Sequence, residues 1–391
     1  MSVYPLTGVV RPYAWGSRTV IAALQGRPVP SDGPEAELWL GAHPGDPSTV
    51  TAPGGPVSLA ALISDDPKGR LGAEVVDEFG VRLPYLMKVL AAAAPLSLQA
   101  HPDAEYARRA FAAQQADPAA PRNYTDAYHK PEMLVALSPF EALCGFRDPA
   151  ESAGVLAALP VPELAPVVAA LRTGVDGMAE AVRTLLTWPA ESRPALVEAA
   201  AEHGPRLAAD LAEHHPGDPG VLVALLLNHV RLAPGEAIWM PAGNMHAYLD
   251  GTAVEIMAAS DNVLRGGLTP KRVDVDELLR VLRFEVLDDP VLAATPVAPG
   301  VVTWRVPVRE FELYRVELDG RRPATPVPGG GPRIVLGTRG DVFVGECHGT
   351  PVEVGTGKAA FVPADAGPIT VAGVGEVFVA TVPVAEPDRT E

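Results

Sequence analysis

The chain has 391 residues, of which 48% are hydrophobic and 20% charged, and its formal net charge is −17. This composition excludes a disordered chain and allows two or three packed units. The negative charge argues against a general nucleic-acid or anionic-membrane surface, although a local group of Lys and Arg could still bind an anionic substrate. With only two cysteines, no signal-peptide pattern and no apolar run of membrane-spanning length, we expect a cytoplasmic protein without a membrane partner.

The first 90 residues predict strands and loops with a short helical interruption. Residues 58–80 indicate one or two short helices that begin after Ser58, which is a favourable N-cap residue. Residues 83–90 form an apolar run that is typical of a strand and contains one charge, Lys88. A lone lysine in such a strand either extends to the solvent or is held there for an anion. We favour the second interpretation.

A strand with an unusually polar face is predicted over residues 95–101. The two-residue period of a strand places Ser97, Gln99 and His101 on one face and three apolar residues on the other. Burying a hydroxyl, an amide and an imidazole costs free energy unless these groups bind something. A metal ion would explain this face. Residues 103–115 then predict a helix with Asp103 as its N-cap.

Three ionisable residues, His129, Lys130 and Glu132, immediately precede a further apolar strand. Pro131 favours an extended conformation at the residue before it. Another strand is expected over residues 140–146. From residue 148 to about 216 the composition becomes rich in Ala, Leu, Glu and Arg with helical spacing, which predicts several short helices. Its histidines, His203, His214 and His215, are expected at the surface.

Strands are expected again after this helical segment. Residues 220–230 fit a helix or a strand equally well. Residues 235–248 indicate a strand and a glycine turn that leads to His246. The next strand is expected at 252–257, with Glu255 inside it. Residues 260–272 look like a long loop that is too charged for the core, and 274–283 like a helix. The alternation of short Val-rich runs with Gly and Pro turns after residue 290 is typical of a β-sandwich or jelly roll.

The possible metal donors lie beside the ends of predicted strands and form a mixed nitrogen and oxygen set: Gln99, His101, His129, Glu132, His246 and Glu255. Such a set suits Zn²⁺ or a harder divalent ion. The spacing is weak evidence by itself, since the sequence contains no HExxH motif. The residues alone leave both a metal site and an ordinary hydrogen-bonded cluster open.

Several long motifs resemble those of type I mannose-6-phosphate isomerases. They are QAHPD (99–103), YHKPEM (128–133), PAGNMHAY (241–248) and SDNVLRGGLTPK (260–271), supported by YAWGS (13–17), ELWLGAHP (37–44) and FVPAD (361–365). They occur in the order found in that family and extend over most of the chain. One difference is Ala100, where valine is more usual; in a strand this residue faces away from Gln99 and His101.

The resemblance implies a mainly β fold with an α insertion. The expected parts are a cupin-type, jelly-roll β-sandwich catalytic core (1–147 and 217–290), a small all-helical insertion (148–216) and a C-terminal cupin-like β-domain (291–391). It also implies one Zn²⁺ held by Gln99, His101, Glu132 and His246. It implies a pocket that contains Arg265 as a catalytic residue, and it leaves His129, Lys130, Lys271 and a zinc-bound water as the candidates for proton transfer. The implied substrate or phosphate contacts are Ser97, Lys88, Tyr248 and Asp261.

The implied reaction is the interconversion of mannose 6-phosphate and fructose 6-phosphate through an enediolate. We expect a small phosphosugar as the only partner, no nucleic acid, and a monomer. Two alternatives stay open from the sequence: a non-catalytic metal- or sugar-binding cupin protein, and an isomerase of another aldose, either phosphorylated or unphosphorylated. A protein that only binds metal would not need Arg265 together with Lys271, so these residues favour the enzyme.

Overall fold

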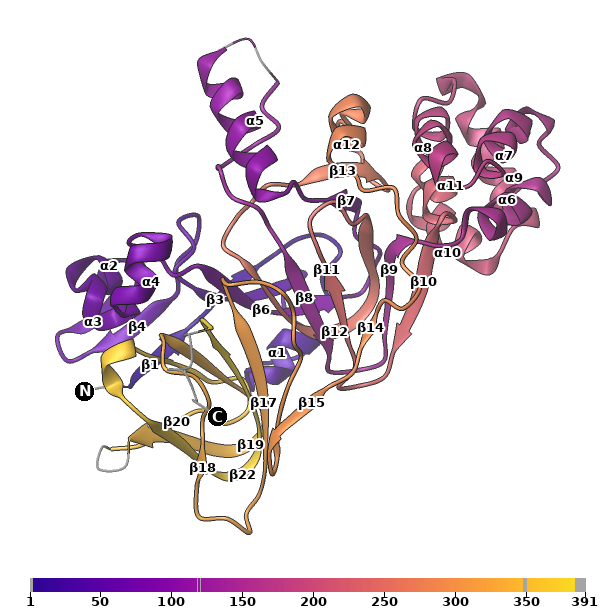
Figure 1. Ribbon diagram of the computed structural model, residues 1–391. Coiled ribbons are helices and arrows are strands. Elements are labelled where there is room, and N and C mark those ends of the chain that lie inside the picture. Colours follow the sequence, from indigo (N-terminus) through magenta and orange to yellow (C-terminus); the bar gives the residue numbers. More distant parts are fainter. Residues whose placement is uncertain (1–2, 118, 120, 347–349, 384–391) are drawn as a thin grey trace, which may run out of the picture. The chain divides into compact units, whose positions relative to one another are not determined.

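A computed structural model describes residues 3–117, 119, 121–346 and 350–383 (Figure 1). The chain divides into two compact units. The first unit comprises Met1–Ala91, Thr252–Ala259 and Ala293–Glu391, and the second comprises Ala92–Gly251 and Ser260–Leu292. Both units contain antiparallel sheets, and helices accompany them, so the expectation of a mainly β protein with helical segments is confirmed.

The first unit contains an 11-stranded antiparallel sheet with the order β15-β16-β17-β22-β19-β21-β1-β4-β5, in which β18 pairs with β22 and β20 pairs with β19. Apolar side chains of this unit, most of them valines, pack into one buried cluster. The strands are β1 (Tyr4–Thr7), β4 (Thr49–Ala52), β5 (Gly55–Ser58), β15 (Thr295–Ala298), β16 (Val301–Thr303), β17 (Glu312–Asp319), β18 (Thr325–Pro326), β19 (Arg333–Glu346), β20 (Val352–Glu353), β21 (Ala359–Val362) and β22 (Ile369–Thr381).

Three further strands of the first unit, β2 (Val9–Arg11), β3 (Glu37–Gly41) and β6 (Tyr85–Ala92), form antiparallel pairs in this order. The helices of this unit are α1 (Val20–Leu24), α2 (Leu59–Asp65), α3 (Pro67–Leu71), α4 (Ala73–Phe79) and the 3₁₀ turn Ala364–Ala366. The predicted one or two helices over residues 58–80 are therefore three. Gly72, whose φ is +89°, separates α3 from α4. Ser58 precedes α2, but its side chain makes no capping hydrogen bond.

The second unit contains two groups of antiparallel strands. In one, β9 (Phe140–Phe146) pairs with β10 (Leu227–Leu232) and with the beginning of β12 (His246–Ala258). The first residue of β12 also pairs with β7 (Leu98–Ala100), and β7 pairs with β13 (Leu264–Gly267). In the other group, β11 (Ala237–Met240) lies between β8 (Glu132–Ala136) and β14 (Val291–Leu292).

Helices α6 to α11 of the second unit gather beside one another (Figure 1). Their apolar faces share one buried cluster with residues of β7, β9, β12 and β13, which fixes the helices on the strands. The helices are α5 (Ala104–Ala116), α6 (Pro149–Ala157), α7 (Ala165–Leu171), α8 (Met178–Leu186), α9 (Arg193–His203), α10 (Arg206–His214), α11 (Gly220–Ala224), α12 (Val275–Val281) and the 3₁₀ turns Pro162–Leu164, Val175–Gly177 and Ala190–Ser192.

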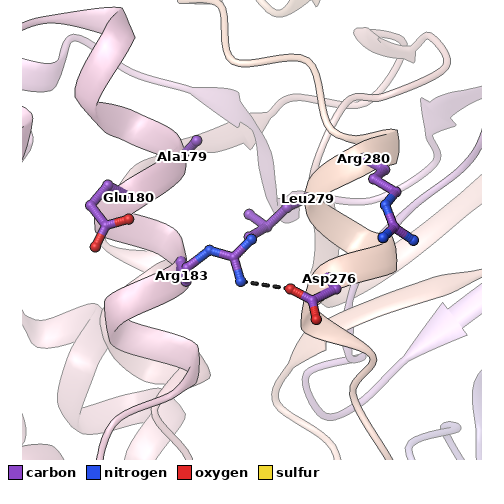
Figure 2. A pocket seen from close by; sticks show the side chains of 6 residues that line it. All are labelled: Ala179, Glu180, Arg183, Asp276, Leu279 and Arg280. Atoms are coloured by element: carbon purple, nitrogen blue, oxygen red, sulfur yellow. Dashed lines mark hydrogen bonds and ion pairs between the residues drawn. The ribbon is translucent and has the colours of Figure 1, made fainter.

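Helix α8 also meets α12, which follows β13 in the chain. Figure 2 shows the surface pocket between them, across which Arg183 Nη1 and Asp276 Oδ1 form an ion pair of 2.6 Å. Both side chains are exposed, so this ion pair contributes little to the stability. No helix among the described residues is long and apolar enough to cross a membrane.

Three sequence expectations need correction. Residues 252–257 are not a separate strand, because β12 continues through Gly251 at φ +119°. Residues 260–272 are not wholly a loop, because β13 lies within them and Leu264 and Leu268 are buried. The sequence left residues 220–230 open between a helix and a strand, and they contain both, α11 followed by β10. His215 is half-buried, whereas His203 and His214 are exposed as expected. Cys347 lies outside the described residues.

Candidate metal centre

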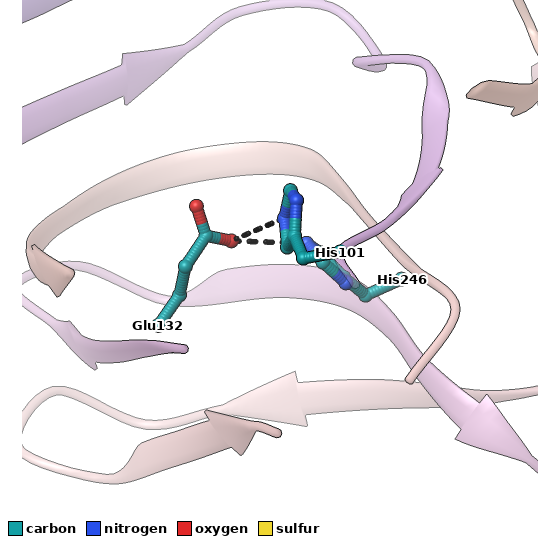
Figure 3. A group of neighbouring side chains, drawn as sticks. All are labelled: His101, Glu132 and His246. Atoms are coloured by element: carbon teal, nitrogen blue, oxygen red, sulfur yellow. Dashed lines mark hydrogen bonds and ion pairs between the residues drawn. The ribbon is translucent and has the colours of Figure 1, made fainter. Parts of the chain in front are cut away.

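Three buried side chains of the second unit converge on one point. His101, Glu132 and His246 each offer one ligand atom, and these atoms lie within 4.8 Å of one another. Figure 3 shows both imidazole rings directed at the same carboxylate oxygen of Glu132. His101 Nε2 is 3.2 Å and His246 Nε2 is 3.1 Å from Glu132 Oε2. Each of the three residues is at most 1% exposed, so water does not shield their interaction.

Local structure places each of these residues at the end of a strand. His101 follows β7, whose Leu98 is fully buried, and the chain then turns into α5. Glu132 is the first residue of β8 and His246 the first of β12. The turn before His246 contains Gly243, with φ +80°, whose amide donates to the His101 carbonyl over 2.8 Å. A side chain at residue 243 would also collide with Val281, so glycine is required there.

Two main-chain carbonyls orient the imidazole rings. His101 Nδ1–H donates to Asn262 O over 2.7 Å, and His246 Nδ1–H donates to Asn244 O over 3.1 Å. In the neutral rings, the Nε2 atoms therefore carry lone pairs and point at an oxygen that also has only lone pairs. Burial, partly offset by the nearby Glu132, lowers the pKa of His101 to about 4, which keeps its ring neutral. A cation between these lone pairs would satisfy the buried acceptors.

Lys130 supplies a positive charge on the other side of the carboxylate. Its Nζ lies 2.8 Å from Glu132 Oε1, and the lysine is only 7% exposed. Burial by itself would raise the pKa of Glu132, but its neighbours, first of all the charge of Lys130, outweigh burial and hold this pKa well below its usual range. Glu132 is therefore ionised, with Oε1 bound to Lys130 and Oε2 directed at the histidines. Two imidazole nitrogens and one carboxylate oxygen fit Zn²⁺.

Gln99, the fourth predicted ligand, lies on β7 next to two other predicted site residues. Its backbone is paired with His246 on one side and with Arg265 on the other. The Gln99 side chain is half-buried, while its neighbours Leu98 and Ala100 are fully buried on the opposite face of the strand. The strand pairing thus brings Gln99, His246 and Arg265 together, and ligation by Gln99 stays a prediction.

The other predicted residues of the second unit have different surroundings. Ser97 and His129 are half-buried. Tyr248 is 1% exposed, and its ring packs edge-on against Phe140 with 5.7 Å between the centroids. Asp261 is exposed, and its amide donates to Asp126 Oδ2 over 3.0 Å. Their predicted roles as proton-transfer residue or substrate contacts stay predictions.

Lys271 lies at a different cavity of the second unit. This cavity has a volume of about 910 Å³ and is formed by the helical segment and the chain after β13, with His214, His215, Asp218 and Thr269 among its lining residues. His101, Glu132 and His246 are not among the lining residues. The exposed Lys271 can meet an anion from solvent, and its predicted part in the reaction is untested.

Lys88 belongs to the first unit, where it is buried among acidic groups. Its Nζ lies 3.0 Å from Glu255 Oε2 and 3.7 Å from Glu37 Oε1. The ammonium also lies 5.5 Å from the centroid of the Trp39 ring, and Trp39 Nε1–H donates to Glu37 Oε2. These contacts hold the Lys88 side chain in place. Its predicted contact with a phosphate stays a prediction.

Two functional contacts escaped the sequence reasoning, namely the carbonyls of Asn244 and Asn262 that bind the imidazole rings. No residue type marks such a contact, because every residue has a main-chain carbonyl. The only available signal was position, since both asparagines lie inside motifs used for the family resemblance, PAGNMHAY and SDNVLRGGLTPK.

Known proteins are similar to this chain in both sequence and fold. Residues 3–149 match the family model "Phosphomannose isomerase type I, catalytic domain". The mannose-6-phosphate isomerase of Escherichia coli is 37% identical over 387 residues, which cover 95% of this chain and 97% of that protein. Mannose-6-phosphate isomerase 2 of Arabidopsis thaliana is 33% identical, with 91% of this chain and 88% of that protein covered.

Among solved structures, a mutant phosphomannose isomerase from Salmonella typhimurium superposes with a TM-score of 0.89 at 33% identity, covering 98% of this chain and all of that one. A mannose 6-phosphate isomerase described as holo and zinc-bound gives a TM-score of 0.88 at 32% identity, with the same coverage. Identity above 30% over nearly the whole length, together with this fold, shows that the chain belongs to the type I phosphomannose isomerase family.

Proposed function

We propose that this chain is a Zn²⁺-dependent aldose–ketose isomerase that interconverts mannose 6-phosphate and fructose 6-phosphate. The observation that carries the proposal is the meeting of His101 Nε2 and His246 Nε2 at Glu132 Oε2, with each Nδ1 bonded to a main-chain carbonyl, in a chain of this family. The zinc-bound relative supports the choice of metal. We assign one Zn²⁺ per chain to His101, Glu132 and His246, with Gln99 as the proposed fourth ligand.

The reaction opens the sugar ring and moves a proton between C2 and C1, so that negative charge develops on the neighbouring oxygens. When bound, Zn²⁺ supplies Lewis-acid stabilisation of that charge. The chain holds the two imidazoles by their Nδ1–H groups and holds Glu132 by Lys130. The ammonium of Lys130 is thus occupied with the ligand carboxylate, which favours a positioning role for Lys130.

Proton transfer is then left to His129 and Lys271 among the predicted catalytic residues. Arg265, on β13 opposite Gln99, is half-buried, and its side chain makes no hydrogen bond or ion pair with the described part of the chain. Its guanidinium can therefore bind the anionic substrate. Ser97, Lys88, Tyr248 and Asp261 are proposed substrate or phosphate contacts. Removal of a true general base should lower kcat by about two to four orders of magnitude.

The organisation and cellular setting are part of the proposal. We propose a monomeric cytoplasmic enzyme with a phosphosugar as its partner. Residues 1–147 and 217–290 would form the catalytic domain, residues 148–216 a helical insertion and residues 291–391 a C-terminal β-domain. The two compact units support separate β-rich bodies, although their limits differ from these ranges.

A coupled assay for fructose 6-phosphate formation tests the function. We expect activity on mannose 6-phosphate, its loss after chelation and its return with Zn²⁺; full activity of the metal-free chain would refute the proposal. Unphosphorylated mannose should be a much poorer substrate. Glu132→Gln should abolish zinc retention and activity. Glu141→Gln is the matched control, because Glu141 also binds a histidine, His229, but at the surface.

A further inference from the structure

Asn262 lies at the centre of the elements that carry the metal centre. It is fully buried, and it lies between β12 and β13 in a segment that the charge of its neighbours had suggested to be a surface loop. Its carbonyl accepts the Nδ1–H of His101 over 2.7 Å, the shorter of the two contacts that orient the imidazole rings. The position of this carbonyl therefore sets the rotation of the His101 ring.

The side chain of Asn262 binds the segment before Lys130. Its Oδ1 accepts from the amide of Thr125 over 2.9 Å. Its Nδ2 donates to Asp126 O over 2.9 Å and to Tyr128 O over 2.8 Å. The Oδ1 and Nδ2 atoms of Asn262 thus both make hydrogen bonds to main-chain groups of residues 125–128. This segment continues directly into His129, Lys130 and Glu132.

Asp126 completes the connection from the opposite side. Its Oδ1 accepts from Ser260 Oγ over 2.8 Å and from Asn262 Nδ2 over 3.2 Å, and its Oδ2 accepts from the amide of Asp261 over 3.0 Å. The segments 125–128 and 260–262 therefore bind each other in both directions. A shift of one segment must shift the other.

We infer that Asn262 is a positioning residue of the metal centre, which fixes the ring of His101 and the segment leading to Lys130 and Glu132 in one mutual geometry. This inference rests on the proposed function, because it concerns the Zn²⁺ site assigned there. In this role Asn262 acts through His101 and through the chain before Lys130. Partners of metal ligands commonly change metal affinity by about 10- to 100-fold when they are lost.

The test is the Zn²⁺ affinity of the purified full chain, measured by competition with a chromogenic chelator. Asn262→Ala should weaken Zn²⁺ binding by about 10- to 100-fold. Asn262→Asp should weaken it further, because the second carboxylate oxygen would face the carbonyls of Asp126 and Tyr128, where the amide now donates. The NMR signal of the His101 ring Nδ1–H should shift or broaden in both variants.

Gln114 provides a matched control in the same unit. It is also a buried amide, and its side chain makes hydrogen bonds to the amides of Asn123 and Tyr124 and to the carbonyl of Tyr124. It therefore holds the same connecting chain, a few residues before Thr125, without contacting His101. Gln114→Ala should lower thermal stability while leaving Zn²⁺ affinity at the wild-type value.

The outcomes separate the inference from its alternatives. Unchanged Zn²⁺ affinity in Asn262→Ala would overturn it, and so would an equal loss in Gln114→Ala, which would indicate general loosening of the loop. If Asn262→Ala does not fold, the substitution Asp126→Ala replaces it, because Asp126 is only half-buried and its loss leaves the Asn262 carbonyl in place. A weaker Zn²⁺ affinity of this variant supports the inference, and an unchanged Zn²⁺ affinity overturns it. Zinc-loaded wild type without isomerase activity would refute the proposed function, but the affinity differences would still support this inference.

Discussion

Replacing Lys130 by methionine would remove the counterion of Glu132 while keeping a side chain of similar length. Both partners are buried, at 7% and 1% exposure, and their 2.8 Å contact is the only ion pair with a lysine that the described structure shows for Glu132. Loss of one partner of a buried ion pair typically costs about 3–5 kcal/mol, because the other charge is left uncompensated.

Proton uptake by Glu132 limits this cost. A carboxyl of ordinary pKa 4.5 can be neutralised at pH 7 for about 1.4 kcal/mol per pH unit, hence about 3 kcal/mol in total. We therefore expect Lys130→Met to lower the free energy of unfolding of the metal-free chain by about 3 kcal/mol. With saturating Zn²⁺ the loss should be much smaller, since the cation takes over part of the charge compensation.

Urea denaturation at pH 7, with chelator and with Zn²⁺, measures both values. Lys358→Met is the matched control, because Lys358 binds Glu353 at 2.6 Å with both side chains about half exposed, where an ion pair is worth about 1 kcal/mol or less. A loss below about 1 kcal/mol in the metal-free Lys130 variant would refute the reasoning from the buried pair. An equal loss with and without Zn²⁺ would show that Lys130 does not act through the metal-ligand carboxylate.

Two other substitutions test the fold around the site and the first unit. Asp103→Ala should destabilise α5 by about 1 kcal/mol, because Asp103 Oδ1 accepts a hydrogen bond from the Tyr106 amide over 2.7 Å. Asp103→Asn can still cap the helix and should be nearly neutral. Equal losses of stability for the two variants in urea denaturation would contradict the capping role. Tyr85→Phe should cost about 1–3 kcal/mol at pH 8, because the Tyr85 hydroxyl donates to the carbonyls of Pro332 and Ala380. Burial raises the pKa of the Tyr85 hydroxyl in the folded chain, so the unfolded chain loses this proton at a lower pH. The free energy of unfolding of the wild type should therefore fall relative to that of Tyr85→Phe as the pH rises above 10. A difference between the two proteins that stays constant with pH would contradict this.

The elements with a clear local signal were predicted well. Residues 140–146 form β9 as expected, and the helix after Asp103 begins with the predicted cap. The wrong strand limit at 252 comes from Gly251, which resembles a turn signal but lies inside a strand. A side chain there would lie 2.6 Å from the Pro139 carbonyl, so glycine serves the close approach of two chain segments, which no local pattern reveals.

The site shows a similar division between what residue types reveal and what only folding reveals. Imidazoles and a carboxylate at strand ends, together with the family motifs, indicated His101, Glu132 and His246, and the structure brings these three together. The charges of Asp261 and Lys271 suggested a surface loop, whereas Asn262 and Leu264 between them are buried. Asn262 is buried against residues 125–128, whereas Leu264 is buried in the cluster shared with the helical segment. Both depend on contacts between segments far apart in the sequence, which no local pattern reveals.

The orientation of both imidazoles by main-chain carbonyls has a consequence for how this centre tolerates mutation. Substitution at residue 244 or 262 changes the side chain but always leaves the carbonyl that accepts the ring proton. No amino-acid substitution removes a main-chain carbonyl; a substitution can only displace it. In a saturation mutagenesis screen, harmful substitutions around His246 should therefore concentrate at residues that fix the backbone, such as Gly243, more than at the residue that provides the acceptor.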